Sequence, residues 1–201
     1  MARTAGSHSD ITGPRIHDAA LRLFAQKGYA AVSMREIARE VGVQAGALYN
    51  YTPDKQSLLV SLLTSHMEDL LTAWASQSAA RHLADTPYQR LERFTRFHIA
   101  YHLARPDAVF VAYMELRNLT PVHFTRVEAL RHQYETELET ILQDGARVGQ
   151  FTVPDSKLTT LAVIAMLTGV TTWYRPGGRL SAGQVADHYW AMVRGAVGAN
   201  A

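Results

Sequence analysis

The chain of 201 residues contains no cysteine. It therefore has no disulfide bond, no thiolate metal site and no cysteine nucleophile. It has no apolar run long enough to cross a bilayer, and its N-terminus lacks the charged-then-apolar pattern of a signal peptide. These absences predict a cytoplasmic protein with no membrane partner.

The usual sequence patterns of an enzyme are also missing. No serine lies in a nucleophile elbow, and no glycine-rich phosphate loop follows a predicted strand. His98 and His102 are four residues apart, so a helix would present both to one metal ion. No HExxH motif and no third ligand accompany them, which favours a structural or pocket-polar role. The sequence predicts no enzyme, no metal and no cofactor.

The excess of positive charge is small, and it lies at the N-terminal end. The formal net charge is +2. Residues 1–55 hold seven Lys and Arg against five acids, whereas the rest of the chain holds 13 of each. Attraction of the N-terminal part to DNA phosphate would explain this distribution. Judged by charge alone, however, a chance excess of two positive residues explains it equally well.

The segment from Ser33 to Lys55 has the pattern of two short helices joined by a tight turn. Ser33 and Glu36 have the spacing of a capping box, so a helix begins there. Gly42 ends this helix, because glycine accepts the left-handed conformation of a sharp turn. A second helix is expected from about Gln44, ending before Pro53. This is the pattern of a helix-turn-helix, whose second helix enters the DNA major groove.

Small residues at the start of the second helix would let the backbone approach the groove closely. We expect Arg35, Gln44 and Asn50 to contact bases or lie near them, and hydroxyl and ammonium groups to contact phosphates, which fix register. The predicted DNA-binding residues are Ser33, Arg35, Gln44, Ala45, Gly46, Ala47, Tyr49, Asn50, Tyr51 and Lys55.

This segment resembles the DNA-binding domain of the TetR (tetracycline-repressor-like) family of bacterial transcription regulators. The resemblance covers about the first 60 residues and is carried by Ala20, Leu23-Phe24, Gly28-Tyr29, Ile37-Ala38, Val41-Gly42-Val43, Gly46, Leu48-Tyr49, Pro53, Lys55 and Leu58-Leu59. Gln44 and Thr52 depart from it, since the family usually has serine and phenylalanine at these positions. The resemblance implies a homodimer that binds operator DNA and a small-molecule effector.

Apolar residues at helical spacing predict an all-α fold of about nine helices. The expected helices span Pro14–Lys27, the two of the helix-turn-helix, Lys55–Leu83, Tyr88–Ala104, Arg105–Met114, Val122–Val148, Asp155–Tyr174 and Ser181–Ala196. The predicted organisation is a mobile tail (1–12), a helix-turn-helix bundle (13–57) and a helical effector-binding and dimerisation domain (58–201). The long helix from Lys55 is expected to move as a lever between the two domains.

The helix over 155–174 is apolar nearly all round, so one of its faces needs a partner beyond its own core. Two C-terminal helices packing against their copies would give a four-helix, two-fold interface. The predicted interface residues are Leu158, Ala162, Ala165, Met166, Gly169, Val185, Tyr189 and Met192.

Aromatic residues crowd the middle of the chain, where they form a core or line an apolar cavity with a few polar groups. The predicted ligand-binding residues are Trp74, Phe94, Phe97, His98, Tyr101, Tyr113, Arg117, Tyr134 and Trp173. The run from Phe151 to Ser181 is similar to TetR-type repressors of fatty-acid and steroid breakdown, which respond to CoA thioesters. That similarity implies an acyl-CoA effector, with Arg175 or Arg179 near the CoA phosphates; the alternative is that the Trp-Tyr-Arg-Pro-Gly-Gly segment is only a structured corner.

The sequence thus predicts a ligand-responsive, homodimeric repressor that an apolar effector releases from a near-palindromic operator. Two alternatives stay open. One is a transcriptional activator of the same fold. The other is a helical small-molecule-binding protein or enzyme with no role at DNA.

Overall fold

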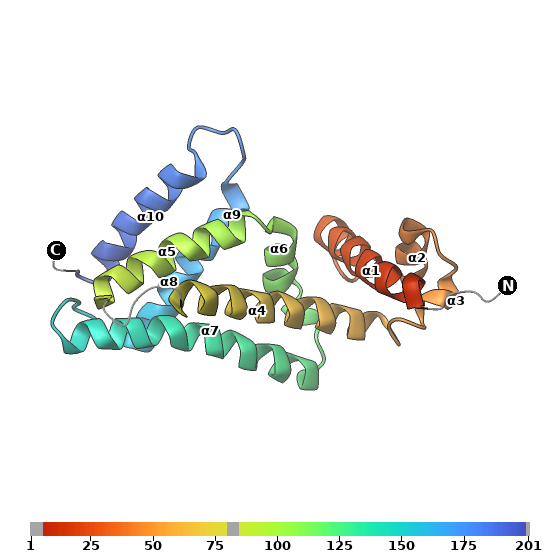
Figure 1. The fold of residues 1–201 in the computed structure, drawn as a ribbon, viewed down its shortest axis with the longest axis horizontal. Helices are drawn as coiled ribbons and strands as arrows, with labels where there is room; N and C mark the ends of the chain where they lie inside the picture. Colours follow the sequence, from red (N-terminus) through yellow and green to blue (C-terminus); the bar gives the residue numbers. More distant parts are fainter. Residues whose placement is uncertain (1–5, 80–84, 200–201) are drawn as a thin grey trace. The chain divides into compact units, whose positions relative to one another are not determined.

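The computed structural model describes residues 6–79 and 85–199, and this part of the chain is helical without any strand. The prediction of an all-α fold is confirmed. The helices are α1 (Gly6–Lys27), α2 (Met34–Val41), α3 (Ala45–Leu48), α4 (Lys55–Ala79), α5 (Pro87–Leu103), α6 (Pro106–Met114), the 3-10 helix η1 (Leu116–Asn118), α7 (Pro121–Arg147), α8 (Ser156–Thr168), α9 (Val170–Trp173) and α10 (Ala182–Ala196) (Figure 1).

Local sequence signals fix most helix boundaries. The Ser33 hydroxyl caps α2, Asp155 caps α8, and Ser181 caps α10 within a full capping box. At the start of α4, the Asp54 carboxylate accepts a 2.6 Å hydrogen bond from the Ser57 backbone N–H. This bond holds the pKa of Asp54 below its ordinary value.

Two expected boundaries need correction, and a third cannot be compared with the described residues. Helix α1 begins at Gly6 rather than Pro14, so residues 6–12 are helical instead of a tail, while residues 1–5 lie outside the described part. The helix expected over 155–174 is divided at Gly169 into α8 and α9. Helix α4 is described to Ala79, so the end expected near Leu83 falls outside the described residues.

The chain divides into two compact units. The first contains the chain up to Met67 together with residues 107–128, and the second contains residues 68–106 and 129–201. Helices α4 and α7 each contribute to both units. The division therefore differs from the boundary expected at residue 57, because α6, η1 and the first turns of α7 belong with the helix-turn-helix.

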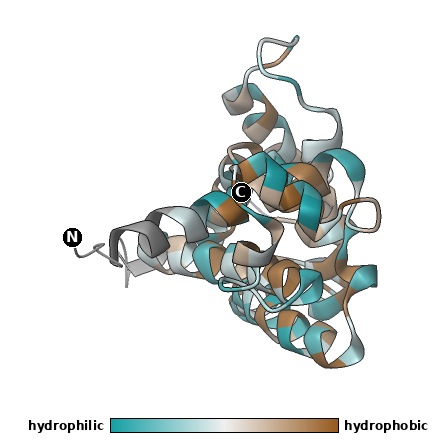
Figure 2. Ribbon diagram, turned by 90° about the vertical axis from the view of Figure 1, so that its right-hand side faces the viewer, coloured by the Kyte–Doolittle hydropathy of each residue, from teal (hydrophilic) through white to brown (hydrophobic). Residues whose placement is uncertain are grey.

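Each unit has its own apolar core. In the first unit α1 packs against α2, and Phe24, Ile37 and Leu48 are fully buried at the centre. In the second unit α5 packs against α10 and α8, and Leu91, Phe94 and Leu167 are fully buried. Individual helices contain both hydrophobic and hydrophilic residues, as amphipathic helices do (Figure 2). Across residues 6–79 and 85–199, no helix combines the length and apolarity needed to cross a membrane.

Candidate DNA-binding and effector sites

The turn of the helix-turn-helix is set by Gly42. This residue has φ 78° and ψ 32°, a left-handed conformation that suits glycine. The Val43 N–H bonds to the Ala38 carbonyl at 2.9 Å, and the Gly42 N–H bonds to the Arg39 carbonyl at 3.2 Å. This pair of bonds is a Schellman motif. The predicted stop at Gly42 is confirmed, and Val43 is partly buried against the core.

Only half of the expected capping box forms at Ser33. The Ser33 hydroxyl accepts a 3.2 Å bond from the Glu36 N–H. The Glu36 carboxylate instead pairs with the Lys27 ammonium at 2.6 Å, which holds the pKa of Glu36 below its ordinary value. Helix α2 is therefore tied to the end of α1 at this point.

The second helix is shorter than predicted. Helix α3 ends at Leu48, and two i→i+3 bonds extend it as turns, from Asn50 N to Ala47 O and from Tyr51 N to Leu48 O. Gln44 occupies the N-cap position without a side-chain capping bond, because its longer side chain replaces the usual serine. Leu48 is fully buried and anchors the helix.

The predicted base-contacting side chains lie on the surface. Arg35, Gln44 and Asn50 are exposed, as is Gly46, and Tyr49 is 54% exposed. Ser33 and Tyr51 are exposed, and Ala45 and Ala47 are partly buried. Exposed guanidinium, amide and phenol groups can form hydrogen bonds with DNA phosphates and with base edges, and the small residues between them let the backbone come close to the DNA.

Lys55 makes contacts that its sequence position did not reveal. Its ammonium donates to the backbone carbonyls of Tyr29, at 2.9 Å, and Val32, at 2.8 Å. It also lies 4.2 Å from the centre of the Tyr29 ring. Two of its three donors therefore join α4 to the loop between α1 and α2, so a phosphate contact would use the third.

Most of the predicted ligand-binding residues form one buried cluster in the second unit. The Phe94 ring contacts both Trp74 and Tyr134, with ring centroids 5.1 Å apart in each pair. The indole N–H of Trp74 donates to Glu137 at 3.0 Å. Phe97 and Tyr101 continue the cluster, and burial raises the pKa of the Tyr101 phenol. The ligand-binding role of this closely packed cluster stays a prediction.

His98 is the polar centre of this cluster. Its Nδ1 is hydrogen-bonded to the Tyr134 hydroxyl at 3.2 Å and its Nε2 to the Thr168 hydroxyl at 3.1 Å. His102 Nδ1 donates to the carbonyl oxygen of His98 at 2.8 Å. Both ring nitrogens of His98 therefore have protein partners, which supports the structural or pocket-polar interpretation.

Three predicted ligand residues are not members of the cluster defined above. Tyr113 and Arg117 belong to the first compact unit, whereas the cluster belongs to the second. Trp173 is largely exposed and donates from its indole to the Tyr189 hydroxyl at 3.3 Å. Helical spacing could not assign these residues to one unit or the other, because it carries no information on packing between distant helices.

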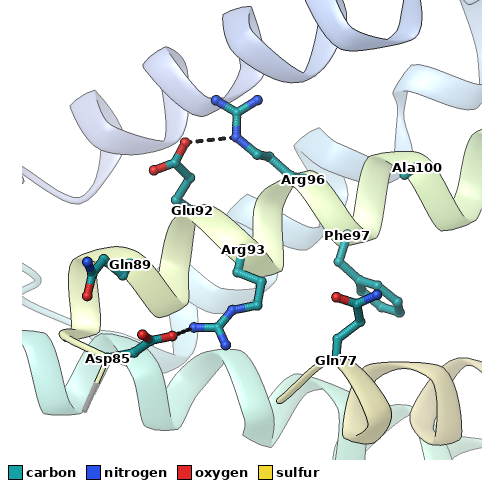
Figure 3. A pocket seen from close by; sticks show the side chains of 8 residues that line it. All are labelled: Gln77, Asp85, Gln89, Glu92, Arg93, Arg96, Phe97 and Ala100. Carbon is teal, nitrogen blue, oxygen red and sulfur yellow. Dashed lines mark hydrogen bonds and ion pairs between the residues drawn. The ribbon is translucent and has the colours of Figure 1, made fainter. Parts of the chain in front are cut away.

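A pocket of 520 Å³ in the second unit includes one member of the cluster, Phe97. It is lined by Gln77, Asp85, Gln89, Glu92, Arg93, Arg96, Phe97 and Ala100 (Figure 3). Arg93 reaches toward Asp85, with which it forms an ion pair, whereas Arg96 extends to the other side of α5. Hydrogen bonds to Asp187 and Glu92 raise the pKa of Arg96. Its members all lie within residues 77–100, but sequence reasoning missed this charged pocket because it considered only the apolar face of the helix in this segment.

The predicted interface residues on α8 and α10 divide by exposure. Leu158 is 65% exposed and Met192 55% exposed, and Ala162 and Ala165 are also exposed. Met166, Gly169 and Tyr189 are partly buried. Val185 is instead buried within its own chain, so its side chain is not on the surface. An apolar helical face of this kind on a folded subunit is typical of a protein–protein contact.

The described elements define a helix-turn-helix protein with a second, all-helical unit. Residues 16–62 match the family model described as "Bacterial regulatory proteins, tetR family". Residues 84–197 match "Tetracyclin repressor-like, C-terminal domain", which is more than half of the chain. The chain belongs to the TetR family of bacterial transcription regulators. It is a regulator of this family and not an enzyme.

The similarity to known proteins covers nearly the whole chain. The HTH-type transcriptional repressor KstR2 of Mycobacterium tuberculosis (strain H37Rv) is 29% identical over 203 residues, which cover 98% of each chain. A tetR-family regulatory protein from Rhodococcus RHA1 has a TM-score of 0.87 at 27% identity and covers 94% of this chain and 98% of its own. AibR, solved with isovaleryl coenzyme A and operator DNA, has a TM-score of 0.83 at 23% identity, covering 90% and 97%, and shares the fold.

Proposed function

We propose that this chain is a homodimeric transcriptional repressor that binds a near-palindromic operator and leaves it when a small apolar effector binds. The observation that carries the proposal is the exposed surface of the helix-turn-helix, where Arg35, Gln44, Tyr49 and Asn50 all face solvent. The name of KstR2, a repressor similar over nearly the whole chain, favours repression over activation.

On this proposal the exposed side chains divide into two roles. Arg35, Gln44 and Asn50 have donors and acceptors that can distinguish bases in the major groove. Ser33, Tyr49 and Tyr51 carry hydroxyl groups that suit phosphate oxygens, which set register. Ala45, Gly46 and Ala47 allow the close approach of the backbone between them.

Dimerisation places two such motifs on one operator. The exposed apolar face of α8 and α10 supports this step, since Leu158, Leu161 and Met192 are all largely exposed in the single chain. A two-fold interface would present two recognition helices about one DNA turn apart, in successive major grooves.

An acyl-CoA is the effector class that we favour. AibR was solved with isovaleryl coenzyme A, and it has the same fold as this chain. The cluster around Phe94 would supply apolar surface for an acyl group, and one of its members, Phe97, lines the 520 Å³ pocket. Arg175 and Arg179 line a smaller pocket with Trp173 and Leu180, which would suit phosphates. Arg175 also donates to the Tyr174 carbonyl at 2.8 Å, so it additionally supports the corner itself.

The signal would pass along elements shared by both units. Helix α4 contributes residues up to Met67 to the first unit and its remainder to the second. A ligand shifts the equilibrium between two conformations only by its difference in affinity for them. We propose that the effector favours the conformation in which the recognition helices are wrongly spaced.

The deciding experiment is a titration of the purified protein with its own upstream DNA and with a scrambled control at fixed salt. We expect specific binding at least ~10³-fold tighter than the control, with release by acyl-CoA but not by free CoA. Release by other apolar ligands only would reject the acyl-CoA class. If the upstream DNA binds no better than the scrambled control, the titration is repeated with a library of genomic fragments, and equal binding there too would reject the repressor proposal. A reporter gene would distinguish repression from activation.

A further inference from the structure

Tyr29, in the loop between α1 and α2, is bound through every polar group it has. Its backbone N–H donates to Glu115 at 3.0 Å, and its carbonyl accepts from Lys55 at 2.9 Å. Its hydroxyl accepts from the Gln56 amide at 3.3 Å. Its ring packs edge-on against Phe24, with centroids 5.3 Å apart. The position of this loop is therefore fixed from several sides.

Glu115 is a buried carboxylate at the end of α6, with 3% of its surface exposed. One of its oxygens accepts from the Tyr29 N–H, and the other accepts from the side-chain amide of Asn118. Burying a carboxylate is unfavourable unless hydrogen bonds replace its water. Gly28, directly before Tyr29, has φ 81°, a left-handed conformation that suits glycine.

Gln56, in the first turn of α4, completes the connection. Its amide N–H also donates to the Asn118 carbonyl at 3.1 Å, and its amide oxygen accepts from the Thr120 N–H at 2.8 Å. The segment 115–120 is thus bonded to both the Tyr29 loop and the start of α4. All these residues belong to the first compact unit.

This network of hydrogen bonds contacts both ends of the helix-turn-helix segment. Val32 directly precedes Ser33, the cap of α2, and Lys55 directly follows the turn after α3. The Lys55 ammonium joins the two ends by bonding to the Tyr29 and Val32 carbonyls. Movement of the Tyr29 loop would therefore move the start of α2 relative to α4.

We propose that Glu115 and Gln56 are positioning residues for operator binding, which hold the helix-turn-helix in its binding-competent placement through Tyr29. This inference rests on the proposed function, and it adds to the DNA-reading unit Glu115, which lies far beyond the motif in the sequence. The apparent dissociation constant equals the intrinsic one divided by the competent fraction. A variant that leaves about one tenth of molecules competent therefore binds operator about tenfold more weakly.

An exchange of donor and acceptor tests the Glu115–Asn118 pair. In Glu115→Gln, the new amide oxygen can keep the bond from the Tyr29 N–H, but its NH₂ group then faces the NH₂ group of Asn118. In Asn118→Asp, the new carboxylate faces the carboxylate of Glu115. The double variant restores one donor and one acceptor, with the direction of the bond reversed. We expect operator affinity to fall about tenfold in each single variant, and to recover in the double variant. Glu128→Gln, the same chemical change elsewhere in this unit, serves as the matched control.

Two further readouts separate positioning from simple folding. Thermal unfolding, measured on the full-length protein, reports the fold. Hydrogen exchange at the Tyr29 amide, followed by NMR without DNA, reports the contact itself. We expect faster exchange in the single variants and recovery in the double variant. A fall in operator affinity that tracks unfolding alone, without rescue, would overturn the proposal, as would unchanged affinity and exchange. If the wild type binds no operator, the proposed function fails, whereas the exchange data still decide whether the contact exists.

Discussion

The imidazole rings of His98 and His102 stack almost in parallel, with centroids 3.8 Å apart and an interplanar angle of 9°. The two residues are one helical turn apart on α5, and both are fully buried. The spacing that suggested a shared metal ion instead brings the ring faces together. His98 directs its nitrogens to Tyr134 and Thr168, which lie on α7 and α8. It therefore joins three helices of the second unit.

We expect His98→Ala to lower the free energy of unfolding by about 3 kcal/mol, because it leaves a cavity and two buried hydroxyl groups without their partner. Urea denaturation followed by circular dichroism at one protein concentration measures this. His188→Ala, at an exposed position of α10, is the control and should change stability by less than about 0.5 kcal/mol. Equal losses in the two variants would contradict the proposed joining role.

Asp54 gives a prediction for the pH dependence of stability. Its pKa is lowered in the folded protein, chiefly by the Ser57 N–H bond. Its contribution is therefore present above the unfolded value, about 3.9 for an aspartate, and is lost as the pH falls through the lower folded value. We expect Asp54→Ala to cost about 1 kcal/mol at pH 7, and the difference from wild type to narrow in acid.

Thermal unfolding of both proteins between neutral pH and about pH 3 measures the Asp54 effect. Asp54→Asn keeps a capping oxygen without a titrating group, so its difference from wild type at neutral pH should be smaller than that of Asp54→Ala and should disappear in acid. A difference between wild type and Asp54→Ala that is constant over the whole range would show that the ionised carboxylate does not matter.

Tyr49 and Gln44 should differ in how their loss affects DNA recognition. We expect Tyr49→Ala to weaken binding to all sequences alike, because a phosphate contact carries no base information. Gln44→Ala should also relax the preference at particular operator positions, by roughly 1–3 kcal/mol for a good bidentate contact. Fluorescence anisotropy with operator, single-base variants and random DNA separates the two effects. Equal losses on operator and random DNA for both variants would contradict the division of roles.

The exposed face of α8 gives a prediction for assembly. Leu158→Glu should weaken the proposed dimer by at least about 100-fold, because an unpaired carboxylate buried at an interface costs several kcal/mol. Size-exclusion chromatography with light scattering, over a range of concentrations, measures the shift to monomer. Val148→Glu is the control, since Val148 is 61% exposed but lies beyond the end of α7. Dimers that are equally stable in both variants would place the interface elsewhere.

The predictions that held concern residues close together in the sequence. The Ser33 cap, the Gly42 turn and the start of α4 at Lys55 were all predictable, because the atoms involved are only a few residues apart. Helical spacing of the apolar residues also predicted the all-α fold, and the two-helix pattern with its tight turn predicted the helix-turn-helix. Helix ends were less accurate at Gly6 and Gly169, where backbone bonding continued or broke a helix without a strong local signal.

The tertiary structure decided which of these helical residues meet. It buried Val185 and exposed Leu158, although both fit the same apolar pattern. It gave Lys55 two carbonyl partners, and it brought Glu115 to the N–H of Tyr29, 86 residues away. Helical periodicity states which side of a helix is apolar, but it does not state which distant element covers that side. That choice depends on the packing of the whole chain. A carboxylate such as that of Glu115 is buried at a position where hydrogen-bond donors replace its water.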